Sequence, residues 1–319
     1  MRRFVNSVMH TIHLEQALRT NQWDINDHDG LTLIQSPLLA QYKGRLTHAF
    51  TTRVGPGDAR GPYDFFNLGR NVPDEAVKRT ALANRERLCA VLGADHAYLK
   101  VPGQVHSGTV VPILEATAKP DMANVDGVST NLAAVPLLLH FADCVPVIIY
   151  EKKKELLSIV HAGWRGTAQA IAANAVKLMI EEWGGDVSQM VAAVGPAIGT
   201  CCYPTGEDVV EQLMLTLSLP LDGSLVQAQV AHGLVKRESI QRRQELQEAI
   251  EKQNAPALIQ PRPDLKAFNA MQLLLAGVPE VDVCSFCTAC RPDLFYSHRQ
   301  SGGKTGRQGA IAMLHSSTG

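Results

Sequence analysis

The chain has 319 residues and a formal net charge of -1, with 45% hydrophobic and 19% charged residues. This length and composition are typical of a globular protein with a large buried core, in one large domain or two smaller ones. The near-neutral charge excludes broad attraction to nucleic acid or to an anionic membrane. No apolar run approaches the ~20 residues that cross a bilayer, so we expect no membrane span.

The first 30 residues are predicted to form an extension outside the catalytic domain, which we place at residues 31–319. The extension begins with basic residues but lacks the apolar core of a secretion signal. Seven cysteines, an odd number in a long chain, do not indicate a disulfide scaffold. A reducing cytoplasm is the compartment that these features favour.

A glycine- and proline-rich loop follows the first strong strand prediction, at residues 48–53. Arg53 stands at the entrance of this loop and Asn67 lies near its end, in the sequence FFNLG. Loops with fixed turns often carry binding groups, although a plain surface loop is an equally good interpretation of either residue. A helix is predicted next, over residues 73–92, because Asp74 stands in its first turn and apolar residues recur at helical spacing.

Residues 137–166 carry the strongest chemical pattern in the chain. Two apolar runs are strand candidates: 137–139, which resumes at 145–150, and 156–160. Three consecutive lysines lie between them, a charged tip that suits a hairpin. Cys144 lies inside the first run, just after Asp143, and His161 ends the second. Strand pairing would therefore bring the thiol and the imidazole close together.

His106, in the upstream sequence QVHS, adds a second imidazole. One thiolate and two imidazoles predict a tetrahedral zinc site whose fourth position is open to water or substrate. Taken singly, a buried cysteine is more often a small hydrophobic residue. A metal-free cysteine hydrolase, with Cys144 as nucleophile and His161 as base, uses the same residues and stays open.

The second half of the chain reads as alternating helices and strands. Helices are predicted at 167–183, from Glu207 to 214, at 238–253 and at 264–276; strands are predicted at 190–194, 281–285 and 310–314. Arg165 precedes the first of these helices, where it could help hold a phosphate or carboxylate. Arg299 and Arg307 belong to a basic, glycine-containing segment that could surround a phosphate, without the residue order of a P-loop.

The other cysteines do not form a recognisable cluster motif. Cys201 and Cys202 are adjacent, so we expect them to be structural or to line a pocket rather than to face one metal. Cys284, Cys287 and Cys290 have a repeated C-x2-C-like spacing but no following fourth cysteine, which disfavours an iron–sulfur cluster. Three incidental thiols are the favoured interpretation.

Several of these segments together resemble the YfiH family, also known as laccase-domain or multicopper polyphenol oxidase proteins and as purine nucleoside phosphorylases. The segments are ADCVPV, SIVHAGWRG, GPAIGTCCYPTG, FYSHR and GKTGRQGAIAML. The resemblance extends from about residue 31 to 314, in the family's motif order. It implies an α/β (α+β) fold, with a mixed β-sheet core and helices packed outside.

The resemblance also implies a function and a set of site residues. The family's zinc ligands correspond to His106, Cys144 and His161, and its pocket residues to Arg53 and Asn67. The implied reactions are phosphorolysis of adenosine, inosine and methylthioadenosine, with adenosine deamination. We expect a monomer or a homodimer. The alternatives are a copper polyphenol oxidase, which would need histidine-rich sites, a peptidoglycan precursor editing factor and a non-enzymatic scaffold.

Overall fold

The computed structural model describes residues 18–19, 23–57, 61–117, 121–217, 234–236 and 260–316. The predicted helix at 238–253 lies outside these described residues. Among them, no helix is both long enough and apolar enough to pass through a lipid bilayer.

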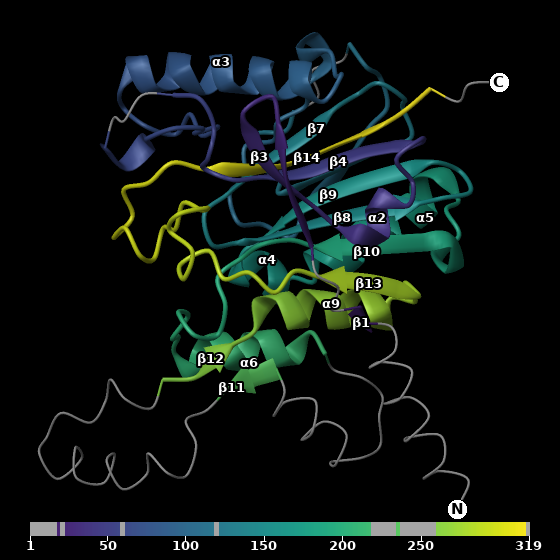
Figure 1. Cartoon of the computed structure of the whole chain (residues 1–319). Helices are drawn as coiled ribbons and strands as arrows, with labels where there is room; N and C mark the ends of the chain where they lie inside the picture. Colours follow the sequence, from purple (N-terminus) through teal and green to yellow (C-terminus); the bar gives the residue numbers. More distant parts are fainter. Residues whose placement is uncertain are drawn as a thin grey trace, which may run out of the picture.

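Two β-sheets form the centre of the molecule (Figure 1). The larger sheet has seven strands, in the spatial order β1 (Leu18–Arg19), β13 (Glu280–Val283), β10 (Met190–Val194), β8 (Val145–Glu151), β9 (Leu156–Ala162), β6 (Gly127–Thr130) and β5 (Val110–Ile113). The smaller sheet has five, in the order β2 (Asp24–His28), β3 (Leu31–Gln35), β4 (Leu46–Thr51), β14 (Gln308–Leu314) and β7 (Leu137–Phe141). A separate pair joins β11 (Val235–Lys236) and β12 (Arg262–Pro263).

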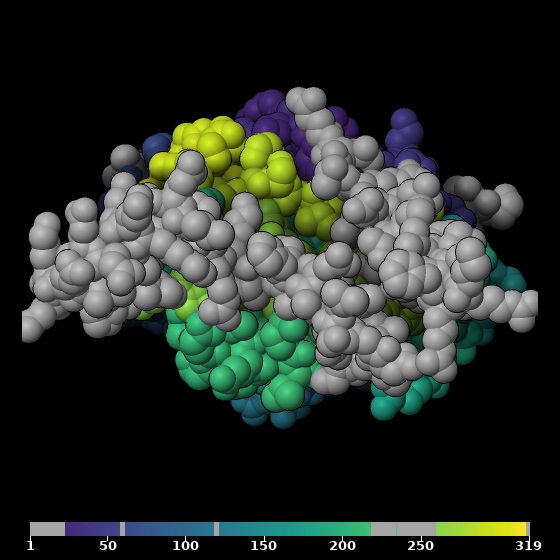
Figure 2. All heavy atoms as spheres, turned by 90° about the horizontal axis from the view of Figure 1, so that it is seen from below, coloured from purple at the N-terminus to yellow at the C-terminus, as the bar shows by residue number. Residues whose placement is uncertain are grey.

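Helices cover the outer faces of the two sheets (Figure 1). The helices are α2 (Pro37–Ala40), α3 (Glu75–Val91), α4 (Trp164–Ala168), α5 (Ile171–Trp183), α6 (Glu207–Leu215) and α9 (Leu265–Leu275), with short 3-10 turns η1 (Gly61–Tyr63), η2 (His96–Tyr98) and η3 (Val187–Gln189). Helix α3 packs on the five-stranded sheet, whereas α5 and α9 pack on the seven-stranded sheet and α6 packs against α4. Figure 2 shows that α6 and the segment after β13 both reach the face seen from below.

Alternation along β8 explains how the layers hold together. Val147 and Ile149 face the helices of the larger sheet, whereas Ile148 and Tyr150 face the core between the two sheets. All four side chains are fully buried. A strand buried on both faces has a continuous apolar sequence, which is the pattern that predicted β8 and β9. The predicted mixed-sheet fold with outer helices is confirmed.

The predicted hairpin is also confirmed, since β8 and β9 pair antiparallel around the lysine tip. The predicted helix at 167–183 is wrong in one respect, because the chain forms α4 and α5 with a break at Ala170, whose φ is 56°. The amide of Asn174 donates to the Gln169 carbonyl at 3.0 Å, and this satisfies a group that the break leaves without its helical partner.

Residues 125–130 have a turn-rich sequence, VDGVST, yet they contain strand β6. Gly127 is required there because a Cβ would lie 2.7 Å from a methyl of Val160. Ser129 bonds to Ser158 across the strands at 2.8 Å, so a buried polar pair replaces the usual apolar one. The N-terminal boundary predicted near residue 30 falls in the turn between β2 and β3, and Trp23 before it is buried.

Candidate metal centre and its cleft

Topology brings the ends of three neighbouring strands to one edge of the larger sheet. Cys144 immediately precedes β8, His161 lies near the end of β9, and Asp126 immediately precedes β6. Because β9 is antiparallel to both neighbours, its end lies beside their starts. Cys144 also ends the short connection from β7, which belongs to the other sheet, so the thiol lies where the chain crosses between sheets.

His106, Cys144 and His161, which we call the three-ligand centre, meet at this edge. Their ligand atoms all lie within 4.8 Å of one another. The Cys144 Sγ is 3.8 Å from His106 Nε2, and the two imidazole ring centroids are 5.0 Å apart. Ordinary zinc bond lengths in tetrahedral geometry give sulfur–nitrogen separations of about 3.5 Å, so the donor set and its spacing fit a zinc ion.

Gly163 allows this convergence. A Cβ at this position would lie 2.9 Å from His106 Cδ2 and 3.0 Å from Cys144 Sγ, which is closer than real contacts allow. A glycine is therefore needed after β9, because any side chain there would collide with two members of the centre.

Asp126 organises the centre, and the sequence did not predict it. Its buried carboxylate accepts backbone N–H bonds from Val105, His106 and Ser107 at 2.7–3.0 Å. It also lies 2.8 Å from Nδ1 of His161, which leaves Nε2 of that ring for a ligand. Burial opposes the carboxylate charge, but the His161 and Ser107 hydrogen bonds hold the pKa of Asp126 at about 2.

The same bonds explain the unusual loop before β5. His106 has a φ of 66° and Gln104 a φ of 57°, backbone conformations that residues other than glycine rarely adopt. Three successive N–H groups pointing at one carboxylate stabilise this strained turn. A lone aspartate before a short strand gives no signal of this role in the sequence.

In the metal-free centre, the thiol and imidazole act on each other. Burial raises the pKa of the Cys144 thiol, but the adjacent imidazoles outweigh it and lower this pKa to about 6. For His161, burial lowers the pKa, while the Cys144 thiolate and Asp126 raise it to about 9. The metal-free pair is therefore a thiolate and an imidazolium at neutral pH.

The three-ligand centre opens into a cleft of about 510 Å³. Four predicted binding residues line this cleft together with the centre: Asn67, Arg165, Arg299 and Arg307. The structure thus brings together seven of the eight predicted site residues. Asn67 is held by its own loop, since its Oδ1 accepts N–H bonds from Gly69 at 2.9 Å and Arg307 at 2.8 Å.

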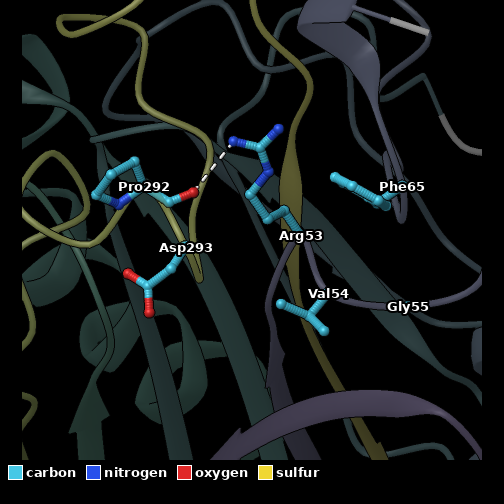
Figure 3. Close-up of a pocket in the computed structure, with 6 residues that line it drawn as sticks. All are labelled: Arg53, Val54, Gly55, Phe65, Pro292 and Asp293. Atoms are coloured by element: carbon cyan, nitrogen blue, oxygen red, sulfur yellow. Dashed lines mark hydrogen bonds between the residues drawn. The ribbon is translucent and has the colours of Figure 1, made fainter. Parts of the chain in front are cut away.

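Arg53 is the exception, because it lines a separate hollow (Figure 3). Its guanidinium donates to the Pro292 carbonyl at 3.1 Å and lies 4.9 Å from the ring centroid of Tyr296 and 5.7 Å from that of Phe65. These contacts place it at the junction of the early loop and the C-terminal segment. The roles that the sequence suggests for Arg53, in the pocket and in catalysis, stay predictions.

The cleft carries an excess of positive charge. Arg70 and Arg85, which the sequence analysis did not single out, line it with the three predicted arginines, and we call these five the arginine group. No member of the group forms an ion pair with a carboxylate within the described part of the chain. Burial and the neighbouring Arg70 charge lower the pKa of Arg85 to about 10, as expected for cations that lack a counter-ion.

His140 is a further cleft residue that the sequence analysis missed. Its Nε2 is buried without a hydrogen-bond partner in the structure. Burial first, and then the charges of Arg85 and Arg307, hold its pKa well below the usual value, so the ring is neutral. A neutral imidazole with one unpaired nitrogen can exchange a hydrogen bond with a bound ligand.

The fold and the site place this chain in a class of α+β proteins. In this class, one cysteine and two histidines form a potential metal site at the mouth of a cleft. A family model described as multi-copper polyphenol oxidoreductase laccase matches residues 47–221 and 223–315, and the chain belongs to this family.

Known proteins agree with this membership. The purine nucleoside phosphorylase YlmD of Geobacillus stearothermophilus is 35% identical over 81% of this chain and 86% of its own length, and its crystal structure superimposes with a TM-score of 0.74. The adenosine deaminase RL5, from an unknown prokaryotic organism, is 30% identical over 81% of this chain and 90% of its own. The structure of Bacillus licheniformis YfiH, 28% identical, covers 92% of this chain and 99% of its own with a TM-score of 0.72. The predicted YfiH resemblance is confirmed.

Proposed function

We propose that this protein is a zinc-dependent purine nucleoside phosphorylase with adenosine deaminase side activity. Adenosine, inosine and methylthioadenosine are the proposed nucleosides. The observation that carries the proposal is the three-ligand centre opening into a cleft whose charged groups are mainly arginines. The printed names of the relatives, purine nucleoside phosphorylase and adenosine deaminase, support the same chemistry.

The arginine group gives the cleft its affinity for phosphate. Guanidinium groups match phosphate oxygens in charge and geometry, and a phosphate would supply the counter-ion that these cations lack. Trp164 and Tyr203 also line the cleft and offer flat surfaces against which a purine can stack. Arg165 and Arg299 lie over these two rings, at 4.4 Å and 5.1 Å from the centroids, so the aromatic and cationic sides of the cleft are contiguous.

In phosphorolysis, a phosphate oxygen forms a bond to C1′ of the ribose while the C1′–N9 bond breaks. The bonding electrons leave with the purine, which gains one proton, and the other product is ribose 1-phosphate. The chain's contribution is to hold the dianion against the face of C1′ opposite the purine and to exclude water, so that phosphate rather than hydroxide attacks. The arginine group performs the first task, and Trp164 and Tyr203 perform the second.

The proposed zinc ion would be held by Cys144 Sγ, His106 Nε2 and His161 Nε2. When bound, it would supply Lewis acidity and one open coordination position at the cleft. Asp126 fixes the His161 tautomer through Nδ1, which keeps the other nitrogen directed at the centre.

Copper oxidase chemistry is the weaker alternative. A multicopper oxidase needs several histidine-rich sites. Among the residues that the structure describes, two groups of potential ligands come together, and only the three-ligand centre contains histidine. The three-ligand centre therefore fits one metal ion rather than a multicopper cluster.

A cysteine hydrolase is the second candidate, because one specific observation favours it. Cys144, His161 and Asp126 stand in the order nucleophile, base and orienting carboxylate, with the thiol pKa lowered to about 6. A cysteine hydrolase would be fully active without metal. The proposed phosphorylase would be inactive without it.

Phosphate dependence tests the proposal. We expect zinc-loaded protein to release adenine from adenosine only when phosphate is present, and to release inosine more slowly in either case. Replacing Arg307 by Gln should lower kcat/KM for phosphate about tenfold or more, because a charged hydrogen bond is lost. Arg291→Gln is the matched control, since that arginine pairs with Asp293 outside the cleft. Base release that ignores phosphate, or survives full chelation, would contradict the proposal.

A further inference from the structure

Four cysteines from two distant segments meet outside the three-ligand centre. Cys201 and Cys202 follow β10, and Cys287 and Cys290 follow β13; we call them the four-cysteine cluster. Their sulfur atoms all lie within 4.8 Å of one another. The expectation that the adjacent Cys201 and Cys202 would not face one site is therefore wrong, and Cys287 and Cys290 lie at the same site.

The fold explains the meeting of these segments. Strands β10 and β13 are parallel neighbours, so the loops that leave them emerge at the same edge. Pairing continues beyond the strands through a parallel bridge between Ala197 and Cys287 and an N–H bond from Thr288 to the Ala197 carbonyl at 3.1 Å. Sequence spacing could not reveal this, because each segment supplies only two thiols.

Distances within the cluster match one shared ion rather than a bond or an iron–sulfur cube. The Cys290 sulfur is 3.4 Å from the sulfurs of both Cys201 and Cys202. A disulfide requires about 2.05 Å and joins only two of them. Four thiolates around one zinc ion, each at about 2.3 Å, stand about 3.8 Å apart. A cubane cluster places each thiolate on a different iron and so holds the sulfurs farther apart.

The surroundings of the cluster are those of a built site. The backbone N–H of Gly199 donates to the Cys287 sulfur at 3.2 Å, and a Cβ on Gly199 would lie 3.3 Å from the Cys201 sulfur. Arg262 donates to the Cys201 carbonyl at 2.9 Å, which places a cation beside a site that would carry net negative charge. The N–H of Cys290 bonds to the Cys287 carbonyl at 3.2 Å, which closes the turn that aims both thiols the same way.

We propose that the four-cysteine cluster binds one structural zinc ion. Thiolates select soft metals, and four protein ligands leave no position for substrate, which defines a structural rather than a catalytic site. Nothing in the proposed phosphorylase activity requires this second ion.

The ion would fasten together two segments that form one wall of the cleft. Tyr203 follows Cys202 directly, and Arg299 belongs to the segment after β13; both line the cleft. Asp143 ties the same two segments: its carboxylate accepts bonds from Thr288 Oγ1 and the Arg299 N–H, both at 2.7 Å, and its backbone carbonyl accepts a bond from the Ile198 N–H at 2.9 Å. The second zinc ion would thus fix the positions of Tyr203 and Arg299 without touching substrate.

Zinc content measured on purified, reduced protein after dialysis against metal-free buffer tests this proposal. We expect about two zinc ions per chain in the native protein and about one in Cys290→Ser. Cys144→Ser should also retain about one, because it loses only the ion of the three-ligand centre. Cys284→Ser is the matched control: this buried thiol of the same segment lies outside the cluster and should leave both ions in place.

Zinc-edge X-ray absorption on Cys144→Ser gives a second reading that does not depend on a cluster variant folding. The expected result is four sulfur neighbours at about 2.3 Å. Nitrogen neighbours, no retained zinc in Cys144→Ser, unchanged zinc in Cys290→Ser, or a disulfide at Cys290 in the reduced protein would each overturn the proposal. Because the two centres lose zinc in different variants, failure here leaves the proposed phosphorylase function standing.

Discussion

Asp126 is the residue on which the candidate centre most depends, because one carboxylate orients a ligand ring and holds the loop that carries another ligand. It accepts bonds from three consecutive N–H groups and from His161. An asparagine would keep the shape but could accept on only one of its two atoms. The loop and the ring would then compete for a single acceptor.

We predict that Asp126→Asn weakens zinc binding at the three-ligand centre about 10- to 100-fold. Competition with a chelator in the Cys290→Ser background measures this affinity without a contribution from the four-cysteine cluster. Asp121→Asn serves as the control, because Asp121 also accepts a backbone N–H, from Ala123 at 3.0 Å, but touches no ligand. Equal affinities in the two variants would show that Asp126 does not support the centre.

Zinc affinity should also depend on pH in a defined window. The metal-free centre has a His161 pKa of about 9 and a Cys144 pKa of about 6. A ligand imidazole must be neutral, so binding between these values displaces one proton, and affinity should fall about tenfold for each pH unit lost. Above pH 9 the dependence should level off, and below pH 6 it should steepen as the thiol also protonates.

The same chelator competition, run from pH 6 to 8, measures this slope. A flat profile would mean that His161 is already neutral in the metal-free protein. Such a result would remove the thiolate–imidazolium pair on which the cysteine hydrolase candidate depends.

Strands buried on both faces stabilise the fold most, and their continuous apolar sequences make them the easiest elements to predict. Ile148 of β8 is fully buried in the core between the sheets, whereas Ile25 of β2 is 42% exposed. We predict that Ile148→Ala lowers the free energy of unfolding by about 2–5 kcal/mol. Ile25→Ala, the matched control, should change it by about 0.5 kcal/mol or less.

Urea unfolding at fixed zinc concentration measures both values, because bound metal adds to apparent stability. If the two substitutions cost the same, the core between the sheets would not be the stabilising layer that the burial indicates.

Elements with long apolar or helical patterns could be predicted from the sequence, and short or polar ones could not. Strands β8 and β9 and helix α3 were predicted because their own residues carry the signal. Strand β6 was missed because a glycine and a buried serine pair replace the usual apolar residues. The break at Ala170 was missed because it depends on a side chain four positions later and on a separate loop.

At the scale of the whole molecule, two sheets between outer helices bring the ends of several strands to one cleft. The meeting of Cys144 and His161 was predictable because they lie at adjacent ends of the paired strands β8 and β9, so local pairing alone brings them together. The four-cysteine cluster was not, since it depends on contacts between segments about 90 residues apart. The arginine group was predictable only in part, because Arg70 and Arg85 carry no signal of their place in the cleft. Relatives with about one third sequence identity have the same architecture.

The central claim is that the cleft transfers a nucleoside's ribose to phosphate at the three-ligand centre. Heavy-oxygen phosphate, labelled at all four oxygens, tests it most directly when incubated with adenosine and zinc-loaded protein. Mass spectrometry should find ribose 1-phosphate that retains every labelled oxygen, and Cys144→Ala should yield none. Free ribose without phosphate, or undiminished product from Cys144→Ala, would contradict the account.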